Sequence, residues 1–156
     1  MSIKNLANDI QEILNNNNNN FEDKEIYNIL NNFDFSKCDF SKFELNTNLS
    51  YSKFKIFSNI YFEIYIILWY PKEKSKIHDH SENGCWLKVL EGMLTEHIYD
   101  SKLNLVKVNE LNANDISFMK DDKIGYHSIS NNSNSITTTI HIYSPINHMT
   151  SYFEFF

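Results

Sequence analysis

Two histidines separated by one residue, His78 and His80, are the first part of the sequence that could do chemistry. In a β-strand, residues two positions apart face the same side, so both imidazoles can reach a single point. Imidazole nitrogen is a common ligand of zinc, copper and iron. Taken alone, the pair is also compatible with two surface histidines in a polar loop.

Two later residues could extend such a site. Cys85 follows the histidine pair closely, and a lone thiol in that place is normally a fourth zinc ligand or a buried apolar filler. His127 comes much later, in a segment typical of a strand. A single strand histidine is more often structural, so His127 gains meaning as a third ligand only beside the first two.

The last long predicted strand alternates polar and apolar side chains. Thr139, His141 and Tyr143 share one face, while Ile140 and Ile142 share the other. We expect the apolar face to lie in the core between the barrel walls. The polar face indicates a wet, functional interior, although a solvent-facing strand would give the same pattern.

The elements that must position these residues are two short helices followed by many short strands. Apolar residues at helical spacing predict the helices, and an asparagine run at 15–20 predicts a solvated loop between them. Short strands separated by turn residues are typical of a β-barrel or sandwich. The predicted helices span residues 1–14 and 25–33, and the predicted strands span 60–70, 85–90, 94–99, 103–108, 115–119, 125–130 and 136–143.

Composition limits the function classes. A chain of 156 residues supports one domain, and its net charge of −6 argues against nucleic acid as the main partner. No apolar run approaches the length of a membrane span, and the N-terminus lacks the pattern of a signal peptide. Only two cysteines are present, so we expect a cytoplasmic protein, and we expect a monomer because no exposed apolar stripe stands out.

The order of the motifs resembles that of cysteine dioxygenase, a thiol dioxygenase family of the cupin superfamily. His78-x-His80 is followed after four residues by Cys85, then by Gly-x-His127, and finally by His141-x-Tyr143-Ser-Pro. Common cupins place a glutamate ligand after the histidine pair, whereas the cysteine dioxygenases have a cysteine there. The resemblance covers roughly residues 51–152.

The resemblance implies the fold and its organisation. We expect a mostly β protein, with a cupin-type, jelly-roll-like β-barrel and a short N-terminal helical cap. Residues 1–50 would form the cap with its asparagine loop. Residues 51–156 would form the barrel, and the two parts would pack together as one domain.

The resemblance also implies roles for residues at the site. Three histidines would be the ligands of a mononuclear Fe(II), namely His78, His80 and His127. Cys85 and Tyr143 would be the pair that the family joins by a thioether cross-link. His141 and Thr139 would support that tyrosine by hydrogen bonds.

The substrate-binding residues carry a departure from the family. Trp69 matches a tryptophan of the active-site wall, and Tyr51 and Lys53 stand where the family has Tyr-x-Arg. The arginine would grip the substrate carboxylate, but this chain contains no arginine. Lysine keeps the charge and loses the planar two-pronged grip. Lys55 is an alternative to Lys53, because the match needs a one-residue gap.

The resulting expectation is an iron-dependent enzyme that converts L-cysteine and O2 to cysteine sulfinic acid. Two alternatives stay open. One is a dioxygenase for another small thiol, such as 3-mercaptopropionate, and the other is a metal-binding cupin without turnover. A closed zinc site that includes Cys85 is a further reading, but it leaves Tyr143 and His141 without a role.

Overall fold

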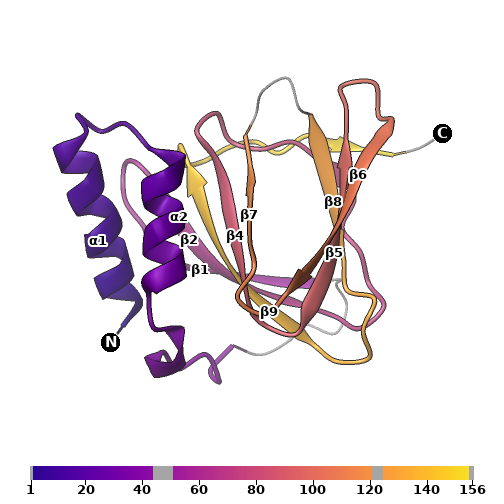
Figure 1. The fold of residues 1–156 in the computed structure, drawn as a ribbon, viewed down its shortest axis with the longest axis horizontal. Coiled ribbons are helices and arrows are strands. Elements are labelled where there is room, and N and C mark those ends of the chain that lie inside the picture. The colour runs from indigo at the N-terminus through magenta and orange to yellow at the C-terminus, as the bar shows by residue number, and fades with distance from the viewer. Residues whose placement is uncertain (1, 44–50, 121–124, 155–156) are drawn as a thin grey trace.

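The computed structural model describes residues 2–43, 51–120 and 125–154. Two helices and a short 3-10 turn precede the strands, and Figure 1 shows three layers, with the helices against one of two facing sheets. The elements are α1 (Ile3–Asn16), α2 (Asp23–Asn32), the 3-10 turn (Phe35–Lys37), β1 (Tyr51–Ser58), β2 (Glu63–Trp69), β3 (Ile77–His78), β4 (Gly84–Glu91), β5 (Met93–Tyr99), β6 (Leu105–Asn112), β7 (Ile116–Met119), β8 (Tyr126–Ser130), β9 (Thr137–Ser144) and β10 (Tyr152–Phe153).

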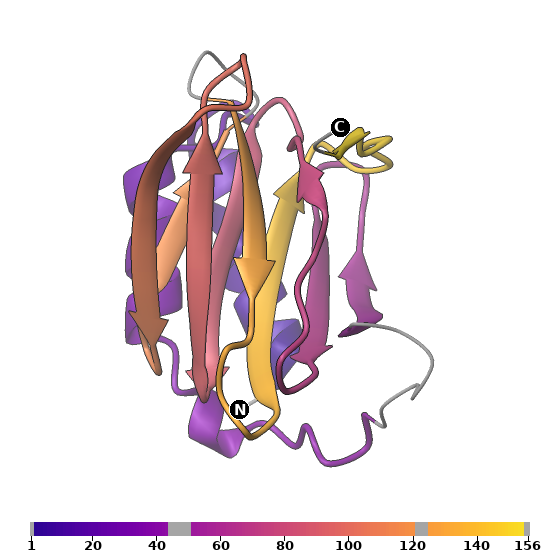
Figure 2. The same ribbon diagram turned by 90° about the vertical axis from the view of Figure 1, so that its right-hand side faces the viewer.

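Each sheet has five antiparallel strands. The strand orders are β1-β2-β9-β4-β7 and β10-β3-β8-β5-β6. Figure 2 looks onto the second sheet, with the first sheet and the helices behind it. The predicted mostly β, jelly-roll-like fold with a helical cap is confirmed. In the part of the chain that the structure describes, the strands form two separate sheets rather than one closed barrel.

The two helices cover the outer face of the first sheet. α1 buries Leu6, Ile10 and Leu14, and α2 buries Ile26 and Leu30. This spacing of three to four residues aligns the apolar side chains along one side of each helix. The helices can therefore seal a large apolar surface of the sheet from water.

The largest apolar cluster lies between helices and sheet, which corrects one expectation. Ile140 and Ile142 of β9 belong to this cluster, not to the space between the two sheets. Ile64 and Ile66 of β2 and Trp86 of β4 join them there. The apolar helix sides need a partner, so the apolar faces of these central strands turn outward. A smaller cluster lies between the sheets and contains Ile67, Trp69, Leu87, Val89, Leu94, Leu111 and Ile129.

Several predicted strand limits differ from the observed ones. The sequence did not predict β1 as a strand, and it placed the end of β6 too early, at residue 108. Both are edge strands. Exposed lysines interrupt β1, and the end of β6 is rich in asparagine and glutamate, so both segments resemble a loop in composition. The proposed boundary at residue 50 lies in a segment outside the described residues.

None of the described helices combines the length and the apolar character that a membrane span requires. The helices instead share an apolar cluster with β2, β4 and β9. This shared cluster supports the proposal that residues 1–50 and 51–156 pack as one domain.

Candidate active site

Three predicted histidines come together between the sheets. His78 ends β3 and pairs with His127 of β8 across the sheet. His80 lies two residues beyond His78, outside the strand, and still turns its ring to the same point. The Nε2 atom of His127 lies 2.9 Å from Nε2 of His80 and 3.2 Å from Nε2 of His78. Ligand atoms of all three residues lie within 4.8 Å of one another.

The hydrogen bonds of two rings fix which nitrogen faces the centre. Nδ1–H of His78 donates to the backbone carbonyl of Lys76 at 2.9 Å. Nδ1–H of His127 donates to Oε1 of Glu96 at 2.8 Å. Carbonyl and carboxylate oxygens only accept, so both Nδ1 atoms carry the proton and both Nε2 lone pairs point inward. Converging lone pairs repel one another, and a metal cation resolves this, so the donor set fits a three-histidine metal site.

Burial keeps two of these imidazoles neutral, which is the form that binds metals. Desolvation, together with the neighbouring His127, lowers the pKa of His78 to about 3. Desolvation, together with His127 and His78, holds the pKa of His80 well below its usual value. His78 and His80 are therefore ready to coordinate at neutral pH.

Glu96 is a residue beside the histidine site that the sequence analysis missed. It is fully buried on β5, and its carboxylate also accepts hydrogen bonds from Ser117 Oγ at 2.8 Å and Asn109 Nδ2 at 2.9 Å. Burial alone would raise the pKa of Glu96, but the hydrogen bonds from His127, Asn109 and Ser117 lower it overall. An ionised carboxylate thus stands directly behind the His127 ring of the candidate metal site.

The sequence did contain a signal for this residue. Glu96 shares one face of the strand with Leu94 and Ile98, because residues two positions apart point to the same side. The pattern therefore predicts an apolar side chain at position 96. A carboxylate in an apolar face must have partners within the fold. Its partners lie on other strands, so the sequence alone could not identify them.

A chain of hydrogen bonds runs along the inner face of β2 and β9. Nε1–H of Trp69 donates to Thr139 Oγ1 at 2.9 Å, and Thr139 Oγ1 lies 3.0 Å from Nε2 of His141. The other nitrogen of His141, Nδ1, lies 3.1 Å from the Tyr143 hydroxyl and 3.6 Å from Cys85 Sγ. The structure thus brings together five residues predicted to belong to one site.

Cys85 and Tyr143 face each other directly across β4 and β9. Burial raises the pKa of the Cys85 thiol to about 12 and raises that of Tyr143 well above its usual value. Burial also holds the pKa of His141 well below that of free imidazole. At neutral pH the thiol and the phenol therefore keep their protons, and the imidazole is uncharged.

The residues predicted to bind substrate line one cavity together with two of the three histidines. Tyr51, Lys53 and Trp69 form part of its wall, as do His78 and His127. The segment after β9 closes one side, because β10 pairs with β3. Glycine at position 84, just before Cys85, has a φ of +115°, and a Cβ there would lie 2.4 Å from a Phe118 ring carbon.

The two candidate lysines share one aromatic neighbour but differ in their other contacts. Lys53 Nζ lies 4.2 Å from the centre of the Tyr65 ring and 4.3 Å from that of Tyr143. Lys55 Nζ lies farther from the Tyr65 ring, at 5.6 Å, and forms an ion pair with Glu63. Although the Lys53 residue as a whole is exposed, desolvation around its ammonium lowers its pKa. Lys53, not Lys55, is the lysine that reaches the histidine cavity.

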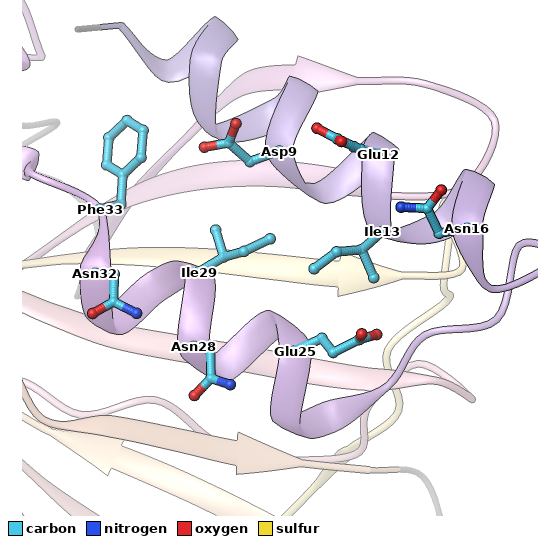
Figure 3. Close-up of a pocket in the computed structure, with 9 residues that line it drawn as sticks. All are labelled: Asp9, Glu12, Ile13, Asn16, Glu25, Asn28, Ile29, Asn32 and Phe33. Carbon is cyan, nitrogen blue, oxygen red and sulfur yellow. The ribbon is translucent and has the colours of Figure 1, made fainter.

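A second hollow lies on the helical cap, between α1 and α2 (Figure 3). Asp9 and Glu12 point into it from α1, and Glu25 does so from α2, above Ile13 and Ile29. It shares no lining residue with the histidine cavity. Two of its carboxylates are exposed, and it holds no histidine or cysteine, so the metal chemistry belongs to the space between the sheets.

Solved structures with a similar fold include several cupins. A conserved protein with a double-stranded β-helix domain from Klebsiella pneumoniae matches with a TM-score of 0.61 and 16% identity, over 73% of this chain and 93% of that protein. A cupin superfamily protein from Desulfitobacterium hafniense matches with a TM-score of 0.53 and 12% identity, over 67% of this chain and 84% of that protein. At these identities the likeness concerns the fold alone.

Sequence relatives carry a more specific name. Cysteine dioxygenase type 1 of Rattus norvegicus is 35% identical over 91 residues, which are 54% of this chain and 45% of that protein. Cysteine dioxygenase type 1 of Danio rerio is 27% identical over 131 residues, covering 78% of this chain and 65% of that protein. The matches thus span about half to two thirds of the length of these curated relatives.

The family comparison covers nearly all of the sequence. The sequence model of the family described as "Cysteine dioxygenase type I" matches residues 1–154 of this chain. This match agrees with the cupin fold and with the three converging histidines. The chain therefore belongs to the cysteine dioxygenase type I family.

Proposed function

We propose that the chain is an iron-dependent thiol dioxygenase that converts L-cysteine and O2 to cysteine sulfinic acid. One observation carries the proposal: three histidines converge beside the paired Cys85 and Tyr143 and a cationic side chain. Membership of the cysteine dioxygenase type I family and the similarity to cysteine dioxygenase type 1 of Rattus norvegicus support it.

His78, His80 and His127 would hold Fe(II). Iron bound there would supply coordination positions for the thiol and for O2 and would favour the thiolate form of the substrate. The protein's part is to keep His78 and His80 neutral and to aim all three rings at one point.

Lys53 would attract the substrate carboxylate. Its ammonium lies at the histidine cavity, and its charge is felt at His78, His141 and Cys85, because it shifts the pKa of each. Tyr51 and Trp69 would form the walls that exclude water around the bound thiol. A small thiol with a carboxylate matches this arrangement.

Tyr143 would donate a hydrogen bond from its hydroxyl to the substrate. Its raised pKa means that the phenol keeps the proton it donates. His141 would hold the hydroxyl in place, and Thr139 would hold His141. We also infer a thioether between Cys85 and Tyr143, which are cross-strand neighbours. Such a link removes two hydrogen atoms, and O2 is the oxidant at hand.

The wider setting is part of the same proposal. We infer a cytoplasmic enzyme whose partners are L-cysteine and O2, without a nucleic acid or membrane partner. We also infer that the chain acts as a monomer.

The test is O2 consumption by the Fe(II)-loaded protein with L-cysteine and 3-mercaptopropionate in parallel, with mass spectrometry of the products. The proposal predicts cysteine sulfinic acid as the preferred product. Preference for 3-mercaptopropionate would favour the second candidate, for which the absence of arginine is the specific observation. No uptake with either thiol would favour a metal-binding protein without turnover.

A further inference from the structure

Tyr65 lies on the inner face of β2, and neither the motifs nor the family resemblance points to it. Its ring lies 4.2 Å from Lys53 Nζ and meets the Tyr143 ring edge-on, at 88° with 5.6 Å between centres. The Tyr143 ring lies on another side of the same ammonium, at 4.3 Å. Both distances are within the range in which an aromatic face attracts a cation.

The orientation of Tyr65 is itself fixed. Its hydroxyl donates to Oε2 of Glu63 at 3.2 Å, and Glu63 is buried and paired with Lys55. Desolvation is the main reason why the pKa of Tyr65 is raised, so the hydroxyl keeps its proton. The ring is therefore an anchored surface, not a mobile side chain.

Lysine at this position is less directional than arginine would be. Its ammonium is a point charge on a flexible chain, and it has no planar fork to set its direction toward a carboxylate. The chain contains no arginine that could take over. Lys55 lies 5.6 Å from the same ring, but its ammonium is paired with Glu63 and it does not line the histidine cavity. Something must hold Lys53 if its charge is to act at one place.

We propose that Tyr65 is a specificity-determining residue that, together with Tyr143, clamps the Lys53 ammonium at the cavity, so that lysine can bind the carboxylate of a small thiol substrate. The inference rests on the proposed function, because it gives Lys53 the carboxylate. It adds that the ring of Tyr65, and not its hydroxyl alone, sets the preference for thiols that carry a carboxylate.

The experiment measures equilibrium binding to the Fe(II)-loaded protein without O2, so that no turnover occurs. The ligands are L-cysteine and cysteamine, which lacks the carboxylate. Tyr65→Leu removes the ring, and its binding of L-cysteine should weaken by roughly fivefold, the worth of one cation–π contact. Its binding of cysteamine should stay unchanged. Tyr65→Phe should recover most of the affinity for L-cysteine.

Three further variants separate the possible failures. Tyr27→Leu changes a half-exposed tyrosine on α2 and should leave both ligands unaffected. Lys53→Met should weaken L-cysteine binding, and Tyr65→Leu should add nothing in that background. If Tyr65→Leu does not fold or load iron, Tyr65→Met, which keeps the bulk, takes its place.

The outcomes distinguish failure of the Tyr65 clamp from failure of the proposed thiol dioxygenase function. Equal losses for L-cysteine and cysteamine, or no recovery with Tyr65→Phe, would overturn the clamp. A loss with Lys53→Met but none with Tyr65→Leu would overturn the clamp alone. Unchanged L-cysteine binding in Lys53→Met would instead remove Lys53 from the proposed function.

Discussion

The two faces of the sheet β1-β2-β9-β4-β7 are built on opposite principles. The outer face is apolar and lies under the helices, where Ile140 and Ile142 are fully buried. On the inner face of the same strand, Thr139 and His141 are just as buried, but each has a hydrogen-bond partner. One strand thus contributes stability on one side and chemistry on the other.

This division means that the site does not need to hold the fold together. Apolar packing stabilises by the area that it removes from water, whereas buried polar groups gain little net stability even when they are paired. We therefore expect substitutions on the two faces to have separable effects.

The largest effect should come from a metal ligand. His80→Ala removes one of three converging nitrogens and leaves too few ligands for a stable centre. Metal affinity should fall by more than the roughly 10- to 100-fold that loss of an outer partner costs. Titration with Fe(II) or Co(II), followed by absorption, measures it. Full metal affinity in this variant would contradict the contrast between the two faces, because metal binding on the inner face would then not depend on the histidines.

A substitution on the outer face should change the stability of the fold and leave metal binding unchanged. Ile140→Ala leaves a cavity between helix and sheet and should lower the free energy of unfolding by about 2–5 kcal/mol, with unchanged metal affinity. Urea unfolding gives the first quantity. Val106→Ala is the control, since Val106 is 63% exposed and its loss should have little effect. A large change in metal affinity with Ile140→Ala would mean that the faces are coupled.

Glu96→Gln should have an intermediate effect on the inner face. The amide keeps the shape of the side chain but loses the negative charge, which orients the His127 ring and makes it a stronger ligand. Metal affinity should therefore fall by roughly 10- to 100-fold. Glu110→Gln is the matched control, because Glu110 is exposed on the neighbouring strand β6. Equal affinities in wild type and Glu96→Gln would show that Glu96 serves only the packing of the sheets.

A further effect should be a dependence of stability on pH in the metal-free protein. His78 has a folded-state pKa of about 3, and those of His80 and His141 are also depressed, against about 6.5 in the unfolded chain. Below that value the unfolded state binds more protons, so stability falls as the pH drops from about 6.5. One histidine contributes at most about 1.4 kcal/mol per pH unit. A midpoint of unfolding that is equal at neutral and mildly acidic pH would contradict this.

The parts of the molecule that depend on local pattern could be predicted from the sequence. The helices follow from the spacing of residues such as Leu6 and Ile10. The three histidines follow from the order of motifs, and the structure brings them together. The pairing of Cys85 with Tyr143 follows from the same resemblance, because the two were expected as neighbours.

The parts that depend on contacts between distant segments could not be predicted. Alternation in β9 separated Ile140 from His141 correctly, but it could not say that the helices cover the apolar side. The contact between Glu96 and His127 exists only because β5 pairs with β8, a pairing that the sequence pattern does not give. Tyr65 acquires a role only through Lys53 on the adjacent strand β1.

Turnover of L-cysteine under ¹⁸O2 tests the central claim most directly. The account predicts that the Fe(II)-loaded protein forms cysteine sulfinic acid with both sulfinate oxygens labelled, because a dioxygenase transfers both atoms of O2 to sulfur. Labelled product should be absent with His80→Ala and present with Ile140→Ala. Sulfinate with one label, or no product from protein that has bound iron, would contradict the claim that the inner face is a thiol dioxygenase site.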